Sequence, residues 1–324
     1  MTGQQRLALA VDIGGTKLAA GLVNDQGDIV SARRVATPSG TDPEVLFGAL
    51  ASAVDATLAS AGVTPGGPGL VPAIGVGTAA PLDLRAGTVS PVNIPAWRSF
   101  PLRDRLADRY QMSVGLIGDA VAVAVGEHWR GAARGHPNVL GMVVSTGVGG
   151  GFVLNGRIVV GATGNAGHIG HISIDPDGPP CVCGGVGCLE AIASGTSIAR
   201  WAREQGFAGG GSAHAVGDAA ARGDPVALAA FARAGHALGM AIAGAVTLLD
   251  LDLVVIGGGV AGAGAVLFDP LARAYSRYAA LGFAARPRVV PAQLGGAAGL
   301  IGAAALAFDP QAYWPTEAAR FVST

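Results

Sequence analysis

Residues 7–23, LALAVDIGGTKLAAGLV, carry the pattern that decides the fold. Two runs rich in Val, Leu and Ala flank Gly14-Gly15-Thr16, which predicts two strands joined by a tight glycine turn. A second turn signal, NDQG at residues 24–27, leads into the strand-like run 28–37. The chain therefore opens as a β-meander.

The same arrangement recurs in the second half of the chain, at residues 138–161. The stretch VVSTGVGGGFVL repeats the strand, glycine-rich turn and strand of the opening, and Asn155-Gly156 is typical of a type I′ hairpin. Two similar α/β halves that face each other predict a cleft between them. We expect one lobe of residues 1–118, completed by about 296–324, and a second lobe of residues 119–295.

Other elements alternate with these two meanders. Helical patterns occupy about 43–61, 101–110 and 296–308, and strand-like runs occupy 72–83, 112–118 and 251–260. Asp119 follows the carboxyl end of the run 112–118 and lies just ahead of a helical stretch. Ligands bind at that edge of open α/β sheets.

The composition excludes several classes of function. Half of the 324 residues are hydrophobic, 13% are charged and the net charge is −1, so no basic surface for nucleic acid or an anionic membrane is expected. Two long apolar stretches, 237–249 and 289–308, are closed or interrupted by Asp, Pro, Gln and Gly, and we interpret both as buried elements. The first fifteen residues lack a signal-peptide layout, which favours the cytoplasm.

Two glycine loops, residues 12–17 and 145–151, occupy matching positions in the two halves. Glycine lets backbone N–H groups approach phosphate oxygens, and Ser and Thr hydroxyls add donors. Neither loop has the Walker A or the GxGxxG spacing. Tight hairpins with positive φ are the alternative, but the pairing of the loops, with Gly257-Gly258-Gly259 after a third strand, favours a nucleotide held across a cleft.

All three cysteines lie in GHIGHISIDPDGPPCVCGGVGCLEAIASG, residues 167–195. Disulfides, a metal, a cysteine nucleophile and core packing are all open for such a cluster. Three cysteines cannot all pair, and a nucleophile would leave two thiols unexplained. A C-x-C-x4-C pattern with a histidine ten residues upstream supplies three thiolates and one imidazole, which suits a closed, structural zinc site.

Two carboxylates are candidates for chemistry. Asp119, at the end of a strand and the start of a helix, is the best candidate for a general base, with an N-cap aspartate as the alternative. Glu190 follows the cysteine cluster and could contact a polar ligand, or it could simply be a carboxylate favoured by the dipole of a helix N-terminus.

The motifs VDIGGTKLAAGLV, VSTGVGGG, GHIGH and CxCGxxGCxEAIASG, in this order, resemble the ROK family of repressors, open reading frames and kinases over essentially the whole chain. The resemblance implies the actin-like, ribonuclease-H-like fold, with ATP, Mg²⁺ and a sugar between two lobes. It selects His171 as the fourth zinc ligand, with Cys181, Cys183 and Cys188, and it makes Asp119 the catalytic base. The sugar contacts that it implies are Asn93, Asp119, His168, His171 and Glu190. The ATP contacts that it implies are Asp12, Gly14, Gly15, Thr16, Lys17, Ser145, Thr146, Gly147, Gly149, Gly150, Gly257, Gly258 and Gly259.

Two positions depart from the family pattern of glucokinases. Gly118 stands where an Asn usually precedes the catalytic Asp, and His168 stands where a Glu is usual, as in bacterial N-acylmannosamine kinases. We therefore expect an ATP-dependent kinase for the 6-hydroxyl of an amino-hexose, either an N-acylmannosamine or a 3-amino-glucose such as kanosamine. A glucokinase is the alternative.

A sugar sensor or repressor is the competing class of function. Repressors of this family carry a helix-turn-helix before the first strand, and only a handful of residues precede LALAVDIGG here. We expect a homodimer or homotetramer whose ligands are a sugar and ATP, without nucleic acid or membrane partners.

Overall fold

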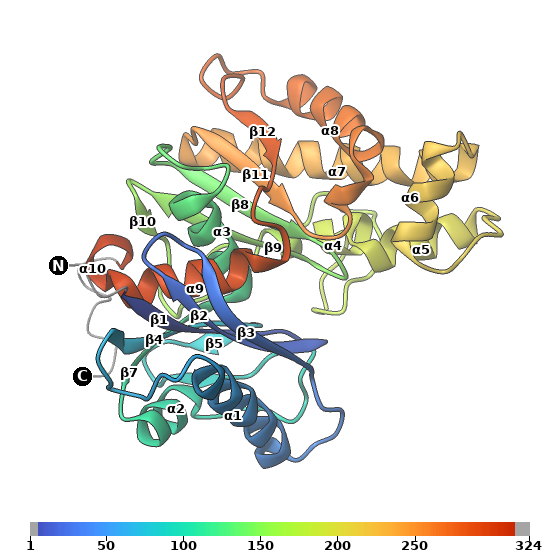
Figure 1. Cartoon of the computed structure of the whole chain (residues 1–324). Coiled ribbons are helices and arrows are strands. Elements are labelled where there is room, and N and C mark those ends of the chain that lie inside the picture. Colours follow the sequence, from blue (N-terminus) through green and yellow to red (C-terminus); the bar gives the residue numbers. More distant parts are fainter. Residues whose placement is uncertain (1–5, 315–324) are drawn as a thin grey trace. The chain divides into compact units, whose positions relative to one another are not determined.

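The computed structural model describes residues 6–314, whose contacts fall into two compact units. The first unit holds the residues up to Pro137, then Gly151–Gly167 and those from Gly296 on. The second holds Asn138–Gly150 and His168–Gly295. Two five-stranded sheets dominate the structure (Figure 1).

The sheet of the first unit has the strand order β3-β2-β1-β4-β7. Its strands are β1 (Leu7–Ile13), β2 (Lys17–Asn24), β3 (Ile29–Ala36), β4 (Leu70–Thr78) and β7 (Ser113–Gly118). The first three strands pair antiparallel, and β4 and β7 continue the sheet in parallel. This arrangement confirms the predicted meander.

The other large sheet has the order β10-β9-β8-β11-β12. Its strands are β8 (Val139–Val144), β9 (Val148–Leu154), β10 (Arg157–Ile158), β11 (Leu253–Gly257) and β12 (Arg288–Pro291). Both sheets place their strands in the order third, second, first, fourth, fifth along the chain, and in both the last two strands join in parallel. The repeat predicted from the sequence is therefore a repeat of topology.

The remaining elements lie between these strands or after the last of them. In the first unit they are α1 (Pro43–Ser60), β5 (Leu82–Asp83), β6 (Thr88–Val89), α2 (Leu102–Tyr110), α3 (Asp119–Arg130), α9 (Ala298–Phe308) and α10 (Pro310–Tyr313). In the second they are η1 (Ile169–His171), α4 (Leu189–Ala193), α5 (Gly195–Glu204), α6 (Ala213–Ala221), α7 (Pro225–Leu249), η2 (Ala261–Ala263) and α8 (Ala265–Tyr278). A short turn η3 (Gly295–Ala297) precedes α9.

Both faces of the first sheet are buried, and they carry side chains of different size. Leu9 and Val11 point into a large core that includes α1 and α2, whereas Ala8 and Ala10 pack with α9 on the opposite face (Figure 1). Successive side chains of a strand alternate between faces, so this sequence gives one bulky face and one small face. The small face lets α9 lie close to the sheet.

Helix α3 belongs by its contacts to the first unit, although the predicted boundary at residue 118 assigns it to the second lobe. The reason is its packing against α9. A Cβ on Gly302 of α9 would overlap the carbonyl of Ala122, and one on Gly126 of α3 would overlap the carbonyl of Ala298. Backbone contact of this kind is open only to glycine. The sequence pattern did not indicate it.

Helix α7 is the one described helix that is long and apolar enough to cross a membrane by length and composition. It is longer than the apolar stretch 237–249 seen in the sequence, because Asp224 caps its N-terminus and Pro225 opens its first turn. Most of its apolar window, 61%, is buried inside the protein, as in the core helix of a soluble domain. It packs along α8.

Candidate functional site

The first glycine turn is a tight hairpin end between β1 and β2. The N–H of Gly14 donates to the carbonyl of Lys17 at 2.9 Å, and the hydroxyl of Thr37 donates to the carbonyl of Gly14 at 2.8 Å. Neither Gly14 nor Gly15 has a positive φ, so the alternative that these glycines serve positive φ is wrong here. Gly15 is needed for space instead, because a Cβ there would overlap the side chain of Asn93.

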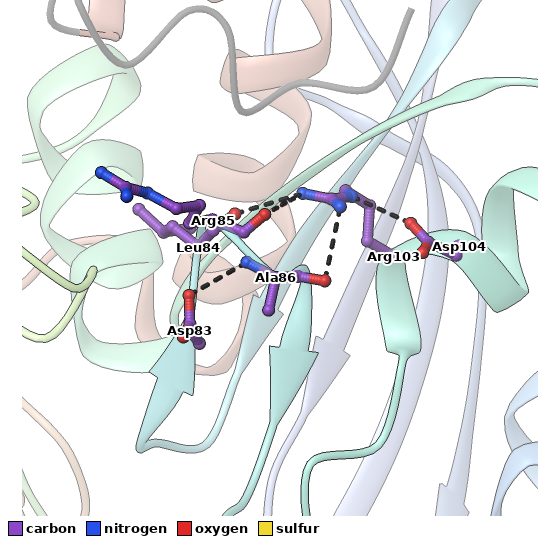
Figure 2. A network of polar contacts seen from close by, with 6 residues as sticks. All are labelled: Asp83, Leu84, Arg85, Ala86, Arg103 and Asp104. Atoms are coloured by element: carbon purple, nitrogen blue, oxygen red, sulfur yellow. Dashed lines mark hydrogen bonds and ion pairs between the residues drawn. The ribbon is translucent and has the colours of Figure 1, made fainter.

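Asn93 follows a small hairpin of β5 and β6 that is held by an arginine (Figure 2). The guanidinium of Arg103 donates to the carbonyls of Leu84 at 3.1 Å and of Arg85 and Ala86 at 3.4 Å. Its Nε also donates to Asp104 at 3.1 Å. The hairpin is therefore fixed to the start of α2. Farther along the chain, Asn93 lies beside the glycine turn. The sequence predicted one strand-like run over 72–83, which the structure divides into β4 and β5.

Asp12 and Asp119 lie on either side of the end of β4. Asp12 pairs with Gly77 in the parallel register of β1 and β4, and a Cβ on Gly77 would lie 3.7 Å from the Cα of Asp119. Asp119 is the first residue of α3 and follows the N-cap Gly118, so it is not itself the N-cap. Its Oδ1 accepts the N–H of Ala120 at 2.7 Å.

The two carboxyl groups share a partly buried setting. Burial raises the pKa of Asp119 to about 6; the N–H of Ala120 opposes this rise, and the negative charge of Asp12 adds to it. Burial also raises the pKa of Asp12, while the charges of Lys17 and Arg34 lower it. A carboxylate whose pKa is raised to about 6 is a stronger base than an ordinary one and is still mostly ionised at neutral pH.

The second glycine loop is held from several sides within the second unit. The carbonyl of Val144 accepts the N–H of Val260 at 3.0 Å, and the carbonyl of Ser145 accepts the N–H of Gly195 at 2.7 Å. The N–H of Val148 donates to Oε2 of Glu190 at 2.8 Å. The loop is therefore a rigid turn with partners from the start of α5, from α4 and from the segment after β11.

Gly257 ends β11, Gly258 and Gly259 follow it, and the first two of these glycines lie against the start of this loop. Gly257 pairs with Val143 in the parallel register of β11 and β8. Gly258 has φ +93°, and a Cβ on it would overlap the carbonyl of Val144. Gly149 and Gly150 belong to β9 itself.

Glu190 lies in the first turn of α4, whose N-cap is Cys188. A Cβ on Gly147 would lie 2.5 Å from Oε2 of Glu190, so the loop and the carboxylate are in close contact. The dipole of a helix N-terminus and the contact to the loop both fit a carboxylate here. Within the second unit, Glu190 therefore holds the second glycine loop through the N–H of Val148.

The cysteines and His171 form one cluster. Their ligand atoms, in His171, Cys181, Cys183 and Cys188, all lie within 4.8 Å of one another. The sulfur of Cys181 lies 3.7 Å from Nδ1 of His171, and the sulfurs of Cys183 and Cys188 lie 3.6 Å apart. Ligands on a zinc ion at about 2.3 Å and tetrahedral angles are separated by about 3.8 Å. The three cysteines are free thiols, so this donor set fits a closed zinc site.

His168 lies just before the segment that carries the cluster. His168 precedes the short turn η1, which ends at His171, and the two rings lie 6.3 Å apart. Ser173 forms an isolated bridge with Cys188, so the chain on either side of the cluster is paired. The exposed ring of His168 is thus attached to a braced segment.

The predicted site residues fall into two groups. Asp12, the turn 14–17, Asn93 and Asp119 lie together in the first unit. The second glycine loop, the glycines after β11, both histidines, the cysteines and Glu190 lie in the second unit. The sharing of one cleft by both groups stays a prediction. Sequence reasoning missed Thr196, which contacts the second loop, and Arg34, whose charge acts on Asp12. The stretch ASGTS, residues 193–197, offered a signal for the first of these.

Comparison with known proteins places the chain in a family. The ROK family pattern matches residues 8–309. A glucokinase of Streptomyces coelicolor is 35% identical over 322 residues, which cover 94% of this chain and 98% of that protein. An N-acetylmannosamine kinase of Shigella boydii is 38% identical over 256 residues, which cover 78% of this chain and 82% of that protein.

A solved structure agrees with these matches. The ROK family glucokinase of Streptomyces griseus, crystallised with glucose and AMPPNP, superposes with a TM-score of 0.79 at 36% identity. The superposition covers 94% of this chain and 99% of that one. The two mixed sheets of equal strand order are thus those of the actin-like ATPase fold. This chain belongs to the ROK family.

Proposed function

We propose that this protein is an ATP-dependent sugar kinase that phosphorylates the 6-hydroxyl of a hexose, and that its preferred substrate is an amino-hexose. The observation that carries the proposal is the setting of Asp119. Its carboxylate lies at the carboxyl end of β7, next to Asp12, and its pKa is raised to about 6. Among the described residues, this setting is the best match to a general base that operates near neutral pH.

In the proposed reaction, Asp119 accepts the proton of the sugar hydroxyl as its oxygen forms a bond to the γ-phosphorus of ATP. The bond between that phosphorus and the bridging oxygen of ADP breaks, and ADP leaves with the electron pair. Such transfers need positioning and charge neutralisation more than covalent chemistry from the protein. Asn93, held against Gly15, supports a position for the sugar close to the base.

The two glycine loops are proposed to hold the phosphates. Their backbone N–H groups and the hydroxyls of Thr16, Ser145 and Thr146 are donors of the type that phosphate oxygens accept. Asp12, a partly buried carboxylate beside the first loop, would hold Mg²⁺, which neutralises phosphate charge when it is bound with ATP. Zinc at the cysteine cluster is proposed as a structural ion, because four protein ligands leave no open position.

The preference for an amino-hexose is supported by two side chains. Gly118 offers no amide next to Asp119, and His168 offers an imidazole where the glucokinase pattern has a carboxylate. A glucose hydroxyl without its partner would lose about 1–3 kcal/mol of binding free energy. An amino group could recover a contact through a carboxylate such as Asp119 or Glu190.

A glucokinase is the second candidate. It is favoured by the 35% identity with the Streptomyces coelicolor glucokinase over 94% of this chain, a longer match than that to N-acetylmannosamine kinase. Gly118 and His168 would then be neutral differences.

A coupled assay of ADP release separates these candidates. Glucose, mannose, N-acetylmannosamine, N-acetylglucosamine and kanosamine are tested at matched concentrations with ATP and Mg²⁺. We expect the highest kcat/KM with one of the amino sugars. A tenfold or greater preference for glucose would show that the protein is a glucokinase. If no sugar led to ADP release, the proposal of kinase activity would be wrong.

A further inference from the structure

Three hydroxyl groups join the start of α5 to the second glycine loop and to α4. The Thr196 hydroxyl donates to the carbonyl of Thr146 at 2.8 Å and lies 3.0 Å from the Ser194 hydroxyl. Ser194 donates to the Ser197 hydroxyl at 2.9 Å, and Ser197 donates to the main-chain carbonyl of Glu190 at 2.9 Å. The chain of contacts therefore runs from the loop to the helix that carries Glu190.

The protons of these hydroxyls determine which hydroxyl donates and which accepts in this series of hydrogen bonds. Each hydroxyl has one proton to donate. Ser197 uses its proton on Glu190 and Ser194 uses its own on Ser197, so the contact between Ser194 and Thr196 depends on the proton of Thr196. That proton has two acceptors within reach, and the carbonyl of Thr146 is the nearer one.

Thr196 differs from its neighbours in what it does for α5. The N-cap of this helix is Ser194, whose hydroxyl also accepts the N–H of Ser197 at 3.2 Å. The Thr196 side chain is exposed, and its hydroxyl reaches sideways to the loop instead of capping the helix. Its removal should therefore leave the helix intact.

The contact determines where the next N–H of the loop points. A trans peptide is planar, so the carbonyl of Thr146 and the N–H of Gly147 point in opposite directions. Because Thr196 holds that carbonyl and the N–H of Gly195 holds the carbonyl of Ser145, the N–H groups of Thr146 and Gly147 are directed away from α5. Both N–H groups belong to residues proposed to contact phosphate.

We propose that Thr196 is a positioning residue for nucleotide binding, which acts by orienting the Thr146–Gly147 peptide of the second glycine loop. This inference rests on the proposed function, because it takes ATP as the ligand of the loop. Thr196 does not need to touch the nucleotide itself. A preorganised donor binds its ligand more tightly because less ordering is needed at the moment of binding.

The test compares Thr196→Val with Thr196→Ser. Valine keeps the branched shape and loses the hydroxyl, whereas serine keeps the hydroxyl. Calorimetry with a non-hydrolysable ATP analogue and Mg²⁺, without sugar, gives the dissociation constant. We expect Thr196→Val to raise it about tenfold, the equivalent of one lost hydrogen bond, and Thr196→Ser to stay within about twofold of the wild type.

A second helix start of the same unit supplies the control. Ser212 caps α6 and accepts the N–H of Ala215 at 3.2 Å, so Ser212→Ala should lower the unfolding temperature without changing the dissociation constant of the analogue. In steady state, Thr196→Val should raise KM for ATP while KM for the sugar and the zinc content stay unchanged.

The outcomes separate the two proposals. Unchanged analogue affinity in Thr196→Val overturns the role of Thr196 and leaves the kinase standing. A weaker analogue affinity in Thr196→Val and not in Thr196→Ser supports that role even if no sugar is phosphorylated. A wild-type protein that does not bind the analogue overturns both.

Discussion

The two glycine loops have the same place in equivalent sheets but different chemistry. The first loop is flanked by Asp12 and Lys17, so its charges belong to the loop itself, and the side chain of Asn93 braces it. The second loop, residues 145–151, has no charged side chain of its own, and the nearby charge comes from Glu190 on α4. The two loops, both of which are proposed to hold phosphates, therefore share a place in the topology and differ in the side chains around them. The proposed proton transfer belongs to the first unit, because Asp119 lies there.

Asp119→Asn, in the first unit, should have the largest effect on activity. Asparagine has nearly the same shape and still accepts the N–H of Ala120, but it cannot take a proton, so kcat should fall about 10²- to 10⁴-fold while sugar affinity changes little. Steady-state kinetics and calorimetry measure the two quantities. Asp224→Asn, the same change at a helix cap, is the control. A near-normal kcat would place the base elsewhere.

Removal of zinc should destabilise the second unit. Elemental analysis is expected to find one zinc per chain, and Cys183→Ser should release it and destabilise the protein by a few kcal/mol, because the loop around the cluster and the start of α4 lose their anchor. Glu190 then loses its fixed position, so KM for the sugar should rise. Thermal unfolding with and without a chelator measures the effect. Active protein without metal would contradict the zinc site.

The double variant Gly118→Asn with His168→Glu tests how both units contribute to the choice of sugar, since it changes one residue in each unit. Its kcat/KM for glucose relative to an amino-hexose should rise roughly five- to 150-fold, the equivalent of about 1–3 kcal/mol. The backbone accepts the first change, because φ at Gly118 is −62° and a Cβ would lie 3.6 Å from Val121. The two single variants show which unit carries the preference. An unchanged ratio would make both departures neutral.

The pH profile gives the smallest expected effect. Asp119 acts as a base only when it is ionised, and its pKa is raised to about 6, so activity is present above this value and is lost as the pH falls through it. We expect kcat/KM at pH 6 to be about half of its value at pH 8, and at pH 5 to be about tenfold lower. If activity fell only near pH 4, the ordinary pKa of an Asp side chain, this carboxyl would not be the group whose titration controls activity.

The sequence predicted the parts of the fold that rest on short-range patterns. The meanders followed from strand-like runs around glycine turns, and a metal cluster of three cysteines with an upstream histidine followed from the spacing and chemistry of zinc ligands. The choice of His171 came from the family resemblance. Asp119 at the end of a strand followed from one apolar run. These features leave direct marks in the order of residues.

Features that depend on contacts between distant segments were not predicted. The grouping of α3 with the first unit depends on Gly126 and Gly302, which meet only after folding. The hairpin held by Arg103 has strands of two residues, too short for any periodic signal (Figure 2). The hydroxyl of Thr196 could equally have faced water, because Ser and Thr at a helix start are common.

The position of α9 on the small face of the first sheet has a consequence for synthesis of the protein. Ala8 and Ala10 pack against a helix that begins at Ala298, so this face of the sheet stays uncovered until almost the whole chain has been translated. At about 5–20 residues per second, the delay is on the order of ten seconds or more. The first unit therefore completes its core only near the end of translation.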